Sequence, residues 1–267
     1  MSAVLLSEVR KLTTTRSWIV LLAATAAAGV VGSGIYAVIG MVAGGTDGGR
    51  NLFTEPDFVT TIYTGANSMA RILAIIGGAM AMGTEFRHKT LSTSYLAVPR
   101  RYQLIIAKAA TTFLYGLAFG LVATVLSLLV AVPTVLAKGG SLFLDQGSSW
   151  QALLLNIVAI ALWTMIGFGF GILIRNMIAS VLIAVGFAYI LEPLLGLVFT
   201  LKHWTVPANL MPGNATTALV GVDANGVLQT GIGADSWPAV AGFFVLLGWA
   251  VVPAVVGLFT TTRQDVA

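Results

Sequence analysis

Six long stretches of the chain consist almost entirely of apolar residues, and shorter segments between them carry most of the charges. A helix needs about 20 mainly apolar residues to cross about 30 Å of hydrocarbon. Backbone polar groups in lipid are satisfied only in helices or closed barrels, and these continuous runs lack the two-residue alternation of a barrel. The pattern therefore predicts an all-α membrane protein whose six transmembrane helices occupy residues 18–42, 68–83, 104–136, 153–174, 177–200 and 239–260.

The composition agrees with a membrane location. Of the 267 residues, 57% are hydrophobic and 9% are charged. Soluble domains carry about 25% charged residues, because their surface faces water. We therefore expect a single transmembrane domain over residues 1–267, with no separate soluble domain.

The sequence offers little that suits catalysis or metal binding. Cysteine is absent, which excludes disulfides, thiolate metal ligands and cysteine nucleophiles. His88 and His203 lie far apart, so no metal site is predicted. The phosphate-binding pattern Gly-x-x-x-x-Gly-Lys-Ser/Thr and the common hydrolase motifs are also missing. We predict that the chain is not an enzyme and does not bind ATP by itself.

The distribution of Lys and Arg predicts the orientation, because cytoplasmic loops carry an excess of these residues. With the N-terminus inside, the cytoplasmic side holds three acids, Glu8, Glu85 and Asp265, and ten cations, which are Arg10, Lys11, Arg16, Arg87, Lys89, Arg100, Arg101, Lys108, Arg175 and Arg263. The outer side then holds four cations and seven acids. Both termini are therefore expected in the cytoplasm. A basic surface for nucleic acid would not divide in this way, so no nucleic-acid partner is predicted.

Three segments outside the spans are expected to carry structure of their own. Residues 1–16 combine apolar positions at helical spacing with charges, which favours a helix in the cytoplasmic interface. The apolar run that follows them is too long for the core of a signal peptide, so we expect it to be retained. Residues 43–67 and 201–238 form long outer segments, and breakers such as Pro212 divide the second into short extracellular helices.

The cytoplasmic loop over residues 85–101 has an amphipathic pattern. Leu91, Tyr95 and Val98 follow the i, i+4, i+7 spacing of one helical face, and Pro99 ends the helix. Such a face is buried either in lipid or in the groove of a partner protein. The loop could also act through its positive charge alone, as a determinant of topology. The residue pattern leaves these interpretations open.

The ends of this loop resemble those of type-2 ABC transporter permeases, particularly bacterial ones. The resemblance rests on Met-Gly-Thr-Glu-Phe-Arg-His-Lys-Thr at residues 82–90 and Ala-Val-Pro-Arg at residues 97–100. The six spans, the N-terminal interfacial helix and the long segment between the fifth and sixth spans agree with it. The resemblance implies a bacterial plasma-membrane protein that spans the membrane several times.

The resemblance also implies a role for the loop and a set of partners. In that family the loop forms a coupling helix seated in a separate ATP-binding subunit, and two permeases pair around a pathway lined mainly by the second and fifth helices. Two ATPase copies, a second permease copy and membrane lipid are the implied partners, with ATP and Mg²⁺ on the ATPase and no cofactor in this chain. The residues implied to face the ATPase are Glu85, Phe86, Arg87, His88, Leu91 and Tyr95. Lys89 departs from the small residue common in relatives.

Two ionisable residues fall inside predicted spans, where charges are costly and usually paired. Arg71 lies near the outer end of the second span and Glu192 lies somewhat deeper in the fifth. We hypothesise that they pair, within one chain or across a dimer, as a gate at the outer mouth of the pathway. The alternative is that each side chain reaches the headgroups separately.

The remaining polar and small residues within the spans are assigned to packing. Gly116 and Gly120, and likewise Gly167 and Gly171, have the spacing that lets membrane helices approach closely. Asn156 and Asn176 are interpreted as residues at helix ends or interfaces.

The function expected from the sequence is that of the membrane-spanning permease subunit of an ATP-driven exporter. Its cargo would be a hydrophobic or amphipathic drug, lipid or peptide. The alternatives are an intramembrane enzyme or assembly factor that transports nothing, and an ion-coupled carrier. The carrier would show paired half-helices and buried ion ligands near the midplane, and the sequence shows neither clearly.

Overall fold

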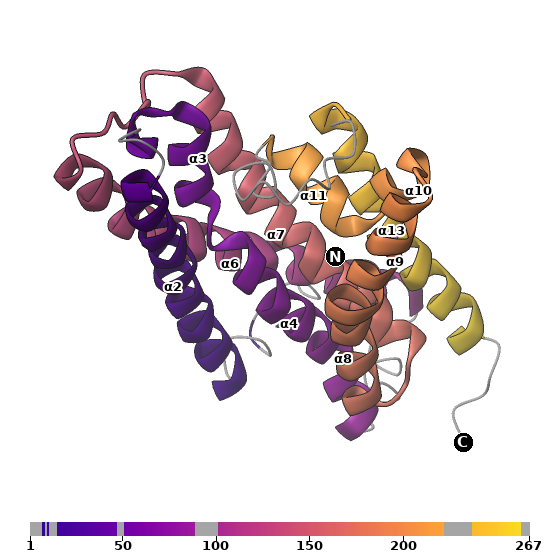
Figure 1. Ribbon diagram of the computed structural model, residues 1–267. Coiled ribbons are helices and arrows are strands. Elements are labelled where there is room, and N and C mark those ends of the chain that lie inside the picture. Colours follow the sequence, from indigo (N-terminus) through magenta and orange to yellow (C-terminus); the bar gives the residue numbers. More distant parts are fainter. Residues whose placement is uncertain are drawn as a thin grey trace.

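The computed structural model describes residues 7, 8, 10, 15–46, 51–88, 101–221 and 237–262. Every regular element within these ranges is helical (Figure 1). Within the described residues, six helical segments are long and apolar enough to cross a membrane: Arg16–Ala43, Pro56–His88, Gln103–Ala137, Gly147–Leu173, Met177–Leu201 and Ala239–Phe259. The predicted number and order of spans are therefore confirmed, whereas the side on which the termini lie remains a prediction.

The helices follow one another in the order of the predicted spans. The long ones are α2 (Arg16–Thr46), α4 (Asn67–His88), α6 (Arg101–Ala137), α7 (Gly147–Leu173) and α13 (Ala239–Thr262). The fifth span is divided into α8 (Met177–Gly186), the π-helix η2 (Phe187–Leu191) and α9 (Glu192–Leu201). Four short elements complete the described chain: η1 (Leu52–Thr54), α3 (Pro56–Thr64), α10 (Thr205–Asn209) and α11 (Pro212–Val220).

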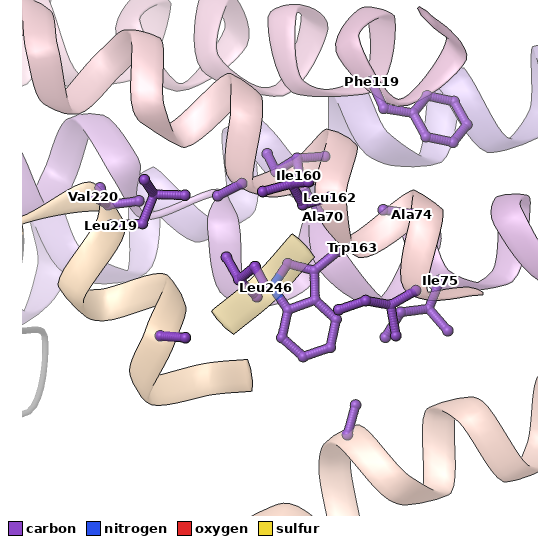
Figure 2. Packing of buried hydrophobic residues seen from close by; sticks show 14 of the residues in the cluster. Ala70, Ala74, Ile75, Phe119, Ile160, Leu162, Trp163, Leu219, Val220 and Leu246 are labelled. Atoms are coloured by element: carbon purple, nitrogen blue, oxygen red, sulfur yellow. The ribbon is translucent and has the colours of Figure 1, made fainter. Parts of the chain in front are cut away.

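Helix α7 forms the centre of the bundle. It packs against α4, α6 and α13. Of its most apolar stretch of residues, 67% are buried inside the structure, a larger share than in any of the other five spans. Its Trp163 is fully buried and lies beside Ile75 of α4 and Leu246 of α13 (Figure 2). The indole N–H of Trp163 donates to the Thr216 hydroxyl of α11 at 2.8 Å. Since this donor is satisfied, the ring can be buried at little polar cost.

Glycines set the close approach of α7 to its neighbours. A Cβ added at Gly116 or Gly120 of α6 would lie 2.8 Å from the Cα of Ala161 or Ile157 on α7. A Cβ at Gly167 would collide with the backbone of Ile75 on α4. Because lipid supplies no hydrophobic force between helices, such backbone contact is a main source of their attraction. The packing role predicted for these glycines is confirmed.

The segment over residues 43–67 differs from the outer loop that the sequence suggested. Its helix α3 is almost wholly buried, with Ile62 and Tyr63 at 0% exposure, and it packs against α2, α6 and α7. Three threonines lower the mean hydropathy of this helix, so the apolar pattern of the sequence did not indicate that it is buried. The hydroxyls of Thr60, Thr61 and Thr64 donate to carbonyls four residues back in the helix, which satisfies them without water.

The two asparagines interpreted as end-of-helix residues behave differently. Asn176 does cap α8, because its side chain accepts from the N–H groups of Ile178 and Ala179. For Asn156 the interpretation is wrong. It is fully buried within α7, where it accepts from Asn67 at 2.7 Å and donates to Thr124 at 3.0 Å. These partners on α4 and α6 remove the cost of a buried amide.

Several predicted segments lie partly outside the described residues. Most of the N-terminal segment 1–16 and most of the loop 85–101 fall there. Within the segment 201–238, two short helices, α10 and α11, follow the fifth span, and α11 begins at Pro212. Residues 222–236 lie outside the described ranges.

Candidate functional site

A cavity of about 820 Å³ opens between the second and fifth spans, at the end of the bundle that carries α10 and α11. Figure 1 shows α9, α10 and α11 grouped on one side of α7. The walls come from α2, α3, α4, η2, α9, α10 and α11. Its polar lining includes Asn67, Ser68, Arg71, Glu192, His203 and Asn214.

The guanidinium of Arg71 is fixed between aromatic rings. Its Cζ lies 5.4 Å from the ring centroid of Trp163 and 5.2 Å from that of Tyr189. Its Nε–H donates to the Tyr189 hydroxyl at 2.9 Å, and that hydroxyl donates to the Ser68 carbonyl at 2.5 Å. Cation–π contacts and a charge-assisted hydrogen bond stabilise a partly buried cation. The charge of Arg71 therefore stays within the span, at the cavity.

Glu192 reaches the cavity from a distorted point of the fifth span. It is 8% exposed, and its Oε1 accepts the backbone N–H of Gly213. The π-helical turn of η2 directly precedes it, and Pro193 directly follows. Proline lacks an N–H and therefore cannot donate in the regular helical pattern, and π-turns commonly accompany functional sites. This distortion sets where the carboxylate lies.

Arg71 and Glu192 share the cavity without direct contact. Both belong to the described part of the chain, and no ion pair joins them there. Gly213 lies close to both groups: a Cβ added there would be 2.6 Å from Glu192 Oε1 and 3.6 Å from Arg71 Nη1. The two charges thus face one point in the cavity. Whether they act as a gate stays a prediction.

One wall of the cavity is apolar. Leu197, Phe199 and Trp204 contribute to it, and Leu197 and Trp204 are 51% and 54% exposed. Leu197 lies on the membrane-spanning helix α9, where a half-exposed apolar side chain faces lipid or a partner rather than water. The cavity therefore combines a polar end with an apolar wall open to the surface of the chain.

A second charged cluster lies near the inner ends of α4 and α6. The Nζ of Lys108 is 2.5 Å from Glu8 Oε2 and 2.9 Å from Glu85 Oε1. All three residues are buried, with 6%, 1% and 5% exposure. This ion cluster joins the N-terminal segment to the last turns of α4 and the first turns of α6. A buried charge of this kind is tolerated only with such partners.

The structure places four of the six residues implied to face an ATPase, and it separates them. Glu85 is buried in the ion cluster, and Phe86 packs against a small apolar core. Arg87 and His88 are exposed at the end of α4. Leu91 and Tyr95 lie outside the described residues. Of the described four, the exposed pair is accessible to a partner, and Glu85 and Phe86 support the base of the loop.

Several residues of both sites escaped the sequence reading. Tyr189 and Trp163 looked like ordinary aromatic residues of apolar spans, and Gly213 like a helix breaker. Lys108 gave a usable signal, since a cation a few residues inside an apolar run calls for a partner. The partner itself could not be chosen, because Glu8 is 100 residues away in the sequence.

Comparisons with known proteins give one family. Residues 4–202 match the sequence profile of the family described as ABC-2 family transporter protein. The matched range ends just after the fifth span. A comparison with curated proteins gave no match.

Proposed function

Because the chain belongs to the ABC-2 transporter family, we propose that it is the permease subunit of an ATP-driven exporter. Family membership and the six spans make it a multi-pass membrane protein and a transporter subunit rather than a catalyst. The observation that carries the proposal is the family match across five of the six spans. In this proposal the cargo is a hydrophobic or amphipathic molecule, and it leaves the cell.

The energy comes from a separate ATP-binding cassette subunit. ABC-2 permeases work with such an ATPase, and here two copies are proposed, which hold ATP and Mg²⁺ and face a permease dimer. ATP binding shifts the permease between states only if it favours one of them. The exposed end of α4 and the loop that follows would contact the ATPase and respond to this change of state. The Lys108 cluster would transmit the movement of α4 to α6 and the N-terminal segment.

The cavity is proposed as part of the transport pathway. It lies between the second and fifth spans, the pair that the family resemblance implies for a pathway. Its end of the bundle is opposite to that of the ion cluster, which agrees with an outer position under the predicted orientation. A location in the bacterial plasma membrane follows from the same proposal.

Co-purification tests the partnership. The chain would be expressed with a candidate ATP-binding cassette subunit from the same genome, and the complex would be reconstituted in lipid vesicles. We expect a stable complex whose ATP hydrolysis rises with substrate. Full transport by the purified chain in vesicles without a nucleotide-hydrolysing partner would contradict the proposal.

A charge in the loop tests coupling. Tyr95→Asp places a carboxylate on the predicted apolar face, and we expect transport to fall about tenfold or more while membrane insertion is retained. Ser141→Asp adds the same charge at an exposed position in the loop before α7 and serves as the control. Normal transport and normal ATPase association of Tyr95→Asp would exclude the loop as the coupling element.

A further inference from the structure

We infer that the cavity binds a lipid-like amphiphile with a zwitterionic head, its ammonium on Glu192 and its anionic phosphate or carboxylate on Arg71. This inference names the substrate class of the proposed exporter and rests on that function only for its role in transport. Binding itself depends on the cavity alone.

The first observation is an unsatisfied acceptor. In the described part of the chain, Glu192 Oε2 is buried and has no hydrogen-bond partner, while Oε1 accepts only the Gly213 N–H. A buried carboxylate is expensive unless donors surround it. An ammonium group supplies three N–H donors and a compensating charge. Glu192 lines the cavity, so its carboxylate is the acidic group that a ligand in the cavity would meet.

The second observation is a fixed cation with spare donors. A guanidinium has five N–H donors, and the structure uses the Nε–H of Arg71 for Tyr189. The rings of Trp163 and Tyr189 hold the guanidinium plane. Planar Nη donors bind phosphate or carboxylate groups in a bidentate manner. Arg71 is therefore prepared for an anion.

The placement of the two charges selects a zwitterion. Both groups face Gly213 and neither neutralises the other through an ion pair. A simple cation at Glu192 would be repelled by Arg71, and a simple anion at Arg71 would be repelled by Glu192. A head group with both charges a few atoms apart satisfies both residues at once. Zwitterionic head groups such as phosphoethanolamine have this arrangement.

The apolar wall selects an amphiphile over a free zwitterion. Leu197, Phe199 and Trp204 continue the cavity toward the surface of the chain, where a lipid tail could lie. The volume of about 820 Å³ falls in the usual range for small-molecule sites and accommodates a head group with part of a chain.

Binding to the purified full chain tests the inference. Three probes of equal chain length would be compared by native mass spectrometry: short-chain phosphatidylethanolamine, phosphatidylglycerol, and an N-acetylated phosphatidylethanolamine. Soluble phosphoethanolamine forms a fourth arm. We expect phosphatidylethanolamine to bind about tenfold more tightly than each of the others. The two other lipids lack the charge-assisted contact of the ammonium, and soluble phosphoethanolamine lacks the contacts of the tail. Equal binding of the three lipids would overturn the inference, and so would equal binding of the soluble head group.

Variants assign the binding to the cavity. Glu192→Gln and Arg71→Gln should each weaken phosphatidylethanolamine binding about tenfold. Asp145→Asn and Lys138→Gln remove exposed charges elsewhere in the described chain and should leave the affinity for phosphatidylethanolamine unchanged. Unaltered affinity in Glu192→Gln would overturn the inference.

A third variant covers the case in which a charge variant does not fold. Gly213→Ala keeps both charges and inserts a methyl group 2.6 Å from Glu192 Oε1. Weaker binding by this variant supports the site, and unchanged binding contradicts it. No ATPase is present in these measurements. Equal binding of the lipids would therefore refute this inference without bearing on the exporter function, which the co-purification experiment tests separately.

Discussion

Lys108 is the residue whose removal should cost most at the inner end of the bundle. It contacts Glu8 and Glu85, and all three are buried. Lys108→Met leaves two buried carboxylates without their shared cation, which should destabilise the protein by about 3–5 kcal/mol. Thermal unfolding of the purified chain in detergent measures this.

The control for Lys108→Met is Lys138→Met, at an exposed position. A second comparison adds Glu85→Gln to the Lys108→Met variant, which removes one of the two carboxylate charges and should recover part of the lost stability. Equal stabilities of wild type and Lys108→Met would show that the ion cluster does not stabilise the fold.

Asn156 is a buried polar residue without charge that, like Lys108, connects different segments of the bundle. Its amide joins α7 to Asn67 of α4 and Thr124 of α6. Asn156→Ala strands both partners inside the bundle, and we expect a loss of about 1–2 kcal/mol. Chemical unfolding monitored by circular dichroism would report it. Gln151→Ala on the exposed side of the same helix is the matched control, and an equal effect of the two variants would contradict the prediction.

At the scale of elements, the contact between α4 and α7 depends on glycine. Gly167 brings α7 against the backbone at Ile75, with no room for a Cβ. Gly167→Val should force the helices apart and cost about 1–3 kcal/mol or more, the usual effect of overpacking. Gly248 of α13 has nothing within 4 Å of an added Cβ, so Gly248→Val is the control.

Expression level and melting temperature of these two glycine variants would be compared. Both carry the same cost of a β-branched residue in a helix, so their difference isolates packing. A Gly248→Val variant as unstable as Gly167→Val would assign the loss to the side chain rather than to the α4–α7 contact.

The distorted fifth span is a second feature of the element scale. Continuous hydropathy over residues 177–200 suggested one regular helix, but the described span contains α8, a π-turn and α9. Pro193 is the sequence signal for the break, since it cannot donate at that point. The resulting geometry, which brings Glu192 to Gly213 of α11, depends on contacts that hydropathy does not encode.

At the scale of the whole molecule, the absence of native cysteine permits a clean test of orientation. Arg87→Cys and Lys202→Cys place single thiols at exposed positions near the inner and outer ends of the predicted topology. A membrane-impermeant maleimide on intact cells should label position 202 and not position 87. Permeabilised cells should label both. Labelling of position 87 alone would reverse the topology and place the cavity inside.

Hydropathy by itself determined the fold class and the six spans, because every membrane crossing requires a long apolar run with satisfied backbone groups. The loop ends at residues 82–90 and 97–100 were sufficient for the family, which the match over residues 4–202 confirms. Arg71 and Glu192 could be selected as candidates, since charges are rare in spans. These are properties of the local sequence.

Only the tertiary structure decided which of those residues meet. The burial of α3, the position of Asn156 inside the bundle and the pairing of Lys108 with Glu8 and Glu85 all depend on contacts between distant segments. Arg71 and Glu192 were placed across a shared cavity rather than in an ion pair, because Tyr189 and the Gly213 N–H hold them apart. Long-range packing fixes distances between side chains, and local composition carries no such distances.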